Sequence, residues 1–170
     1  TALAQTNRPA APPLPRPDPA QNAPAQNEPP PKPEDIAYGA YQRGYFLSAF
    51  NTATKLAAEN NVKAMALLGE LYANGFGIGR DDVKAAQWYK LAAERGDREA
   101  MFALALMKFQ GRGGPRDAAE GARLFEQAAN LGHIAAAYNL GLLYLQGQEV
   151  KQDFARAAEL FRMGARGGSP

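Results

Sequence analysis

The chain has 170 residues, of which 46% are hydrophobic, and a formal net charge of +2. This length suits one domain of ordinary size with an extension. The mixed charges argue against the clustered Lys and Arg that a nucleic-acid partner needs, and the absence of cysteine excludes disulfides, thiolate metal sites and cysteine nucleophiles.

The first segment of the chain, residues 1–33, holds eleven of the thirteen prolines and none of the glycines or aromatic residues. Such a segment buries too little apolar surface to offset its ordering entropy, which predicts a disordered proline-rich arm. Its Ala2-Leu3-Ala4 stretch resembles the end of a signal peptide, so we expect a periplasmic or otherwise exported protein. An alanine-rich linker in a cytoplasmic protein is the alternative.

Residues 34–61 follow the arm and predict a first helical hairpin without a long glycine loop. Its small residues Gly44, Ala49, Ala57 and Ala58 permit close helix packing.

From residue 62 onward the sequence repeats with a period of 36. Eight columns keep this register: Ala64/Ala100/Ala136, Leu68/Leu104/Leu140, Gly69/Ala105/Gly141, Gly75/Gly111/Gly147, Ala86/Ala122/Ala158, Tyr89/Phe125/Phe161, Ala93/Ala129/Ala165 and Gly96/Gly132/Gly168. The apolar residues of each copy recur at intervals of three and four, which predicts two helices joined by a glycine loop. We therefore expect repeats at 62–97, 98–133 and 134–170, with the aromatic column filling the space between hairpins. One hairpin cannot cover its own apolar face, so the units are expected to stack.

Copy one carries the residues by which a family can be identified: Ala64, Leu68-Gly69, Tyr72, Gly75-Phe76-Gly77, Asp81, Lys84-Ala85, Trp88-Tyr89, Ala92-Ala93 and Gly96. This pattern resembles the Sel1-like repeat family, a relative of tetratricopeptide repeats, and residues 41–58 resemble a tetratricopeptide unit. Copy two departs from it at Lys108 and Gly121, and copy three has a shortened loop at Gly147-Gln148-Glu149. The resemblance implies an all-α, right-handed α-solenoid of antiparallel hairpins that acts as a non-catalytic adaptor for protein partners, often in bacterial envelopes. Cysteine-rich relatives that bind penicillins carry cysteines that this chain lacks.

No catalytic, cofactor-binding or metal-ligating set stands out from the sequence. The lone histidine, His133, is interpreted as a polar residue of an inter-repeat loop, and two serines, Ser48 and Ser169, do not support a catalytic triad. The Gly75–Gly79 segment follows a helix rather than a strand, so we interpret it as a hairpin connection and not as a phosphate loop. We expect no enzyme activity, cofactor or small-molecule substrate.

The first helix of each hairpin lines the concave face in tetratricopeptide-like units. Mapping that geometry selects four sets of positions: Tyr38, Tyr41 and Gln42; Lys63, Ala66, Glu70, Ala73 and Asn74; Glu99, Phe102, Leu106, Phe109 and Gln110; Ala135, Tyr138, Leu142, Leu145 and Gln146. Contiguous apolar residues on a surface indicate an interaction site. The predicted partner-binding residues are therefore Tyr38, Tyr41, Phe102, Leu106, Phe109, Tyr138, Leu142 and Leu145.

Three occupants of this face remain open: a protein or peptide partner, the neighbouring repeats themselves, and the chain's own arm. The apolar side of the last helix, residues 151–167, indicates either further repeats or a second docking surface. The preferred hypothesis is an envelope scaffold or regulator that grips a partner on its concave face. The alternative is a structural accessory subunit that attaches to a membrane complex through the arm.

Overall fold

A computed structural model describes residues 31–167 of the chain. The predicted arm lies outside these residues except for its last three positions. The signal-peptide-like stretch at Ala2-Leu3-Ala4 also lies outside them.

The described residues fold into eight helices and no strand, which confirms the all-α class. The helices are α1 (Pro33–Gln42), α2 (Phe46–Ala58), α3 (Val62–Asn74), α4 (Asp82–Glu94), α5 (Arg98–Gln110), α6 (Ala118–Asn130), α7 (Ile134–Gln146) and α8 (Phe154–Arg166). Among residues 31–167, no helix is long and apolar enough to span a lipid bilayer.

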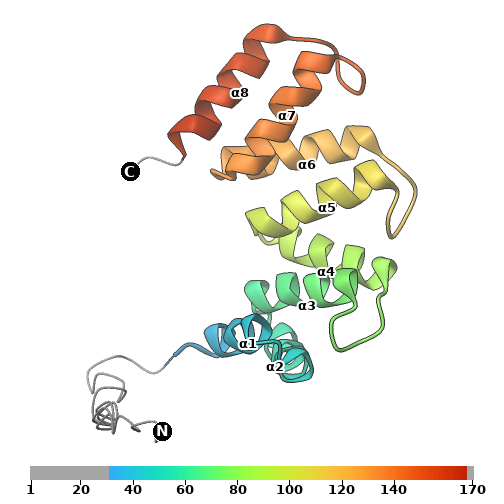
Figure 1. Cartoon of the computed structure of the whole chain (residues 1–170), viewed down its shortest axis with the longest axis vertical. Helices are drawn as coiled ribbons and strands as arrows, with labels where there is room; N and C mark the ends of the chain where they lie inside the picture. Colours follow the sequence, from blue (N-terminus) through green and yellow to red (C-terminus); the bar gives the residue numbers. More distant parts are fainter. Residues whose placement is uncertain (1–30, 168–170) are drawn as a thin grey trace, which may run out of the picture. The chain divides into compact units, whose positions relative to one another are not determined.

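The helices pack as four successive hairpins, α1/α2, α3/α4, α5/α6 and α7/α8, and follow one another in chain order (Figure 1). Each hairpin also packs on the next, because the second helix of one contacts the first helix of the following one. The first helices α1 and α3 touch, as do α3 and α5. This stacking confirms the predicted solenoid of helix pairs.

The ends of the repeated helices use the same polar contacts in each copy. The cap residues just before the first helices α3, α5 and α7 are Asn61, Asp97 and His133. Their side chains accept hydrogen bonds from backbone N–H groups three residues later, at 2.9, 2.7 and 3.1 Å. The second helices α4, α6 and α8 are capped in the same way by Asp81, Asp117 and Asp153. Such side chains satisfy backbone donors that have no partner inside the helix. His133 thus lies in the connection between two repeats, as expected, and there it is buried and caps α7.

The core is built from alanine and leucine, and many of its alanines are fully buried. Small side chains permit close helix approach, and each repeat adds one aromatic ring from its second helix. We expected these rings between hairpins; the structure shows each of them against the first helix of its own hairpin. A Cβ atom on Gly69 of α3 would lie 2.6 Å from the Tyr89 ring, and one on Gly141 of α7 would lie 2.7 Å from the Phe161 ring. The glycine column exists because these rings occupy the space of a side chain.

Copy two makes room for an aromatic ring at a different position. Ala105 stands where the other copies have glycine, and the missing space is supplied by Gly121 on α6. The Phe109 ring from α5 lies against Gly121 and stacks on Phe125 with a centroid distance of 5.4 Å. The departure at Gly121 is therefore compensated within the hairpin.

The loop after α5 ties the second and third hairpins together. The Arg112 guanidinium donates to both carboxylate oxygens of Asp82, at 2.6 and 3.2 Å, and to the carbonyl oxygen of Ala73 at 3.2 Å. The neighbouring Gly113 has a φ of +73°, and a Cβ atom there would lie 2.2 Å from the Asp82 carbonyl oxygen. The backbone approach at this loop is close enough to require glycine.

Candidate protein-docking groove

The described chain has a groove of about 650 Å³ on the side of the first helices α1, α3 and α5. We call it the α1/α3/α5 groove. Its lining comes from three successive hairpins, so the stacking of the repeats creates it. No single hairpin could form this surface alone.

Apolar side chains form much of the inner wall of this groove. Tyr38 on α1, Leu67 and Ala66 on α3, and Phe102 and Leu106 on α5 all line it. Tyr38 is 50% exposed, and its ring stacks on that of Tyr41 at 5.9 Å. The groove therefore offers an aromatic side chain that is held in place by a neighbour and still open to solvent.

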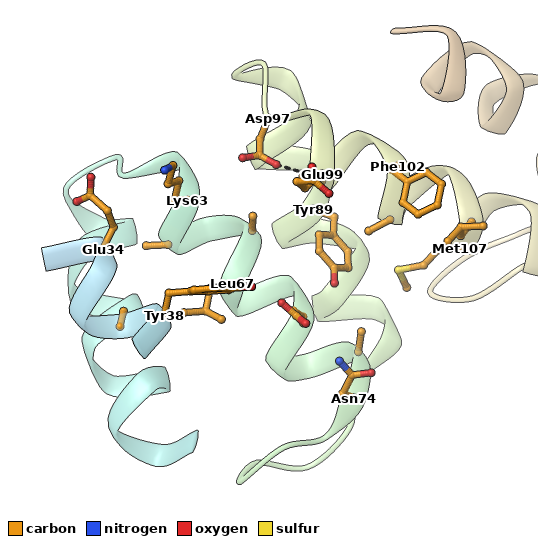
Figure 2. Close-up of a pocket in the computed structure, with 18 of the residues that line it drawn as sticks. Glu34, Tyr38, Lys63, Leu67, Asn74, Tyr89, Asp97, Glu99, Phe102 and Met107 are labelled. Atoms are coloured by element: carbon orange, nitrogen blue, oxygen red, sulfur yellow. Dashed lines mark hydrogen bonds between the residues drawn. The ribbon is translucent and has the colours of Figure 1, made fainter. Parts of the chain in front are cut away.

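Charged side chains also line this groove. Figure 2 shows Glu34, Lys63, Asp97 and Glu99 in the upper half of the view, with Tyr38 and Leu67 below them. Glu70 lies deeper, where its carboxylate accepts a 2.6 Å hydrogen bond from the Tyr41 hydroxyl. Burial and this hydrogen bond raise the pKa of Tyr41, and burial with the nearby Glu70 charge raises the pKa of Tyr89. Both tyrosines therefore remain neutral well above physiological pH.

A second contact network holds the groove lining in place at α5. His133 is 8% exposed, and its ring stacks on Phe102 with a centroid distance of 4.4 Å. Because its Nδ1 accepts the Ala136 N–H, the remaining nitrogen Nε2 carries the proton and donates to Glu99 at 3.0 Å. This chain of contacts from α7 fixes both Phe102 and Glu99 on the groove wall.

The structure places the residues that the sequence selected on different surfaces. Tyr38, Phe102 and Leu106 line the α1/α3/α5 groove together with the polar positions Lys63, Glu70 and Glu99. Tyr41 lies behind the groove and holds Glu70. Phe109 does not line it, because its ring turns toward α6 and packs on Phe125.

The selected residues of α7 lie apart from this groove. Tyr138 is 55% exposed and lines a smaller apolar depression with Phe161, while Leu142 and Leu145 line neither depression. Sequence reasoning did not single out Glu34, Asp35 and Asp97, which belong to the groove. The sequence features that could have indicated them are the acidic first turn of α1, for Glu34 and Asp35, and the cap position before α5, for Asp97.

Residues 31–167 contain no cluster of three or more histidine, aspartate or glutamate side chains suited to a metal ion. The groove is instead a broad, open surface with apolar and charged parts. Stacked helix hairpins with such a surface define the class of α-solenoid interaction scaffolds.

The family model described as Sel1 repeat matches residues 62–97, 98–133 and 134–169. The chain therefore belongs to the Sel1 repeat family, whose members are generally non-catalytic scaffolds for protein–protein interaction. A search of curated proteins finds no match.

Solved structures agree with this assignment. A Sel1 repeat protein from Oxalobacter formigenes superposes with a TM-score of 0.75 at 28% identity, over 79% of this chain and 55% of its own. The protein c5321, a protective antigen of uropathogenic Escherichia coli with an SLR fold, gives a TM-score of 0.70 at 31% identity, over 79% of this chain and 30% of its own. Cysteine-rich protein B of Helicobacter pylori shares the fold at 23% identity with a TM-score of 0.50, over 61% of this chain and 93% of its own. The chain thus spans about half of the first of these proteins and less than a third of the second.

Proposed function

We propose that the chain is a scaffold or regulator of the bacterial cell envelope that binds a segment of a partner protein in the α1/α3/α5 groove. The observation that carries the proposal is the continuity of this groove across three hairpins, with Tyr38, Phe102 and Leu106 in its lining. Exposed aromatic and aliphatic side chains in a groove are the common anchors of protein segments.

The envelope location rests on the signal-peptide-like Ala2-Leu3-Ala4 stretch and on the proline-rich arm. A proline-rich arm acts as a spacer, so it would let the solenoid work at a distance from a membrane. Attachment to a membrane complex through the arm is the second candidate, and the eleven prolines of residues 1–33 favour it.

The test uses Tyr38→Gln combined with Leu106→Gln, which makes the groove wall polar. The matched control is Tyr45→Gln combined with Leu47→Gln, because these residues are 62% and 61% exposed and lie outside the groove. Each full-length variant is used to capture partners from an envelope fraction, and far-UV circular dichroism checks its helix content.

The proposal expects the groove variant to lose the partner that the wild type and the control capture. Loss of an aromatic hot spot costs about 2 kcal/mol or more, which weakens the affinity roughly thirtyfold. Attachment through the arm predicts a different result: binding survives the groove substitutions and is lost only when residues 5–33 are deleted.

A further inference from the structure

The α1/α3/α5 groove carries more acidic than basic side chains. Its carboxylates come from all three hairpins: Glu34, Asp35, Glu70, Asp97 and Glu99. Two cationic side chains, Lys63 and Arg112, also line it. The Asp82 carboxylate binds both Arg112 and Arg80, at 2.6 and 3.0 Å, and Nε of Arg98 lies 3.6 Å from a Glu99 oxygen. With Asp82 counted, six carboxylates still outnumber the four cationic side chains Lys63, Arg80, Arg98 and Arg112.

Neutral donors hold most of these carboxylates in place. Glu70 accepts from the Tyr41 hydroxyl at 2.6 Å, Glu34 from the Asn61 amide at 3.2 Å, and Asp97 from the backbone N–H at the start of α5. A neutral donor fixes the position of a carboxylate without cancelling its charge. These side chains are therefore ordered, negatively charged and still able to attract a cation.

Glu99 is the most accessible of the fixed carboxylates, with a side chain that is 67% exposed. One of its oxygens binds Nε2 of His133 at 3.0 Å, and the other lies 3.6 Å from Nε of Arg98. Phe102 stacks on the same histidine ring. An apolar anchor site and a negative charge thus lie next to each other on α5.

We propose that the occupant of the groove is a basic protein segment in which Lys or Arg side chains alternate with apolar ones. This inference rests on the proposed function and names the chemistry of the partner. Apolar side chains of the segment would pack against Tyr38, Phe102 and Leu106, and its cations would meet Glu70 and Glu99. Charge complementarity of this kind speeds association and excludes acidic partners.

The spacing of the helices gives the length of the segment. Packed helix axes lie about 8–10 Å apart, so the distance from α1 to α5 is roughly 20 Å. An extended chain covers about 3.3 Å per residue, so about six residues cross the groove.

The experiment selects peptides from a random library of roughly ten-residue sequences displayed on phage, with the full-length chain as bait. The length exceeds the roughly six residues that cross the groove. Selected peptides are resynthesised with a fluorescent label, and their Kd is measured by fluorescence polarisation. We expect Lys and Arg to be enriched at least about twofold over the library, and a rise from about 50 to about 300 mM salt to weaken binding roughly fivefold.

The decisive variant is Glu70→Gln combined with Glu99→Gln. Glutamine keeps the shape of both side chains and still accepts the hydrogen bonds from Tyr41 and His133. Glu59→Gln combined with Glu94→Gln is the matched control, because it removes two exposed carboxylates outside the groove. We expect the Kd to rise about tenfold in the groove variant and to stay within about twofold in the control.

The outcomes separate this inference from the proposed function. Selected peptides that need Tyr38 and Leu106 but lack basic residues, or that bind the Glu70/Glu99 variant unchanged, would overturn the basic partner and leave the docking groove intact. Peptides that bind the Tyr38/Leu106 variant unchanged, or failure to select any peptide, would overturn both. Arg8 and Arg16 are the arginines of the chain's own arm. If peptides are selected only after Arg8→Gln and Arg16→Gln, the groove binds the arm, and if a selected peptide dissociates a dimer of the chain, the groove binds a second copy. Either result refutes the proposal.

Discussion

The packing of Phe109 against Gly121 leads to a sharp prediction about stability. Both other repeats have alanine where copy two has Gly121, namely Ala85 and Ala157. Gly121→Ala would place a Cβ atom 2.6 Å from Cε2 and 2.8 Å from Cδ2 of the Phe109 ring. The ring has little room to withdraw, because it also stacks on Phe125.

Two opposing effects determine how much Gly121→Ala changes the free energy of unfolding. Carbon atoms pack best about 3.5–4.0 Å apart, so the ring must move by roughly 1 Å, and overpacking of this kind costs about 1–3 kcal/mol. Replacing glycine by alanine inside a helix contributes about 1 kcal/mol in the opposite direction. We expect Gly121→Ala to lower the free energy of unfolding by about 1 kcal/mol. In a Phe109→Ala background the clash is absent, so the same substitution should raise it by about 1 kcal/mol.

Urea unfolding followed by far-UV circular dichroism measures the four proteins of this double-mutant cycle. Gly39→Ala is the control, because a Cβ atom there meets only the flexible Arg43 guanidinium at 3.6 Å. This control should stabilise the chain by about 1 kcal/mol. If Gly121→Ala has the same effect with and without the Phe109 ring, the steric explanation is wrong.

Substitutions at His133, Arg112 and Gly113, with controls at positions 133 and 114, test one cap and the loop between hairpins by the same urea assay. His133→Ala removes a helix cap and should cost about 1 kcal/mol, whereas His133→Asn, which has the neutral side chain of the cap Asn61 in the first repeat, should cost less; equal losses would contradict the cap. Hydrogen bonds from Arg112 and, as the second largest effect, from Arg80 lower the pKa of Asp82. This ion pair therefore contributes stability above the unfolded pKa of about 4 and loses it as the pH falls. The stability difference between wild type and Arg112→Gln should therefore shrink from about pH 7 to about pH 3, and a constant difference would exclude this origin. Gly113→Ala should cost about 2 kcal/mol because of its positive φ and the nearby Asp82 carbonyl, whereas Gly114→Ala has open space and should be nearly neutral.

The repeat columns predicted the fold because each column corresponds to one packing position. The alanines at 64, 100 and 136 are all buried at 0–1% exposure, and each follows a cap residue by three positions. Period and residue type were enough to derive helices, hairpins and stacking. The prediction of the family has the same basis.

The columns were less informative about side-chain direction. Phe109 was expected on the groove wall, but it turns to α6 because Gly121 leaves room for its ring. The relevant signal was a pair of departures, a phenylalanine where copy one has Ala73 and a glycine where copy one has Ala85. A column read alone does not reveal such compensation.

Coverage by the next hairpin also differs along a column. The His133 ring of the following repeat stacks on Phe102 and leaves it half-buried in the groove lining, whereas Tyr138, 36 positions later, is 55% exposed. The position that corresponds to His133 in the next repeat is 169, which lies outside the described residues. Whether a first-helix aromatic belongs to core or surface thus depends on a residue about 31 positions further along the chain.

The internal repeats also separate the positions that fix the fold from those that are available for recognition. Most packing columns keep their chemistry in every copy, as the leucine column of Leu68 does. Groove columns change it: Lys63 is replaced by Glu99 and then by an alanine, and Glu70 is replaced by Leu106. A packing position that changes does so with a compensating neighbour, as Phe109 and Gly121 do, whereas the changes at these groove positions alter the charge of the surface. The acidic character of the α1/α3/α5 groove therefore does not follow from the repeat itself, which is why we place the specificity of the scaffold in these columns.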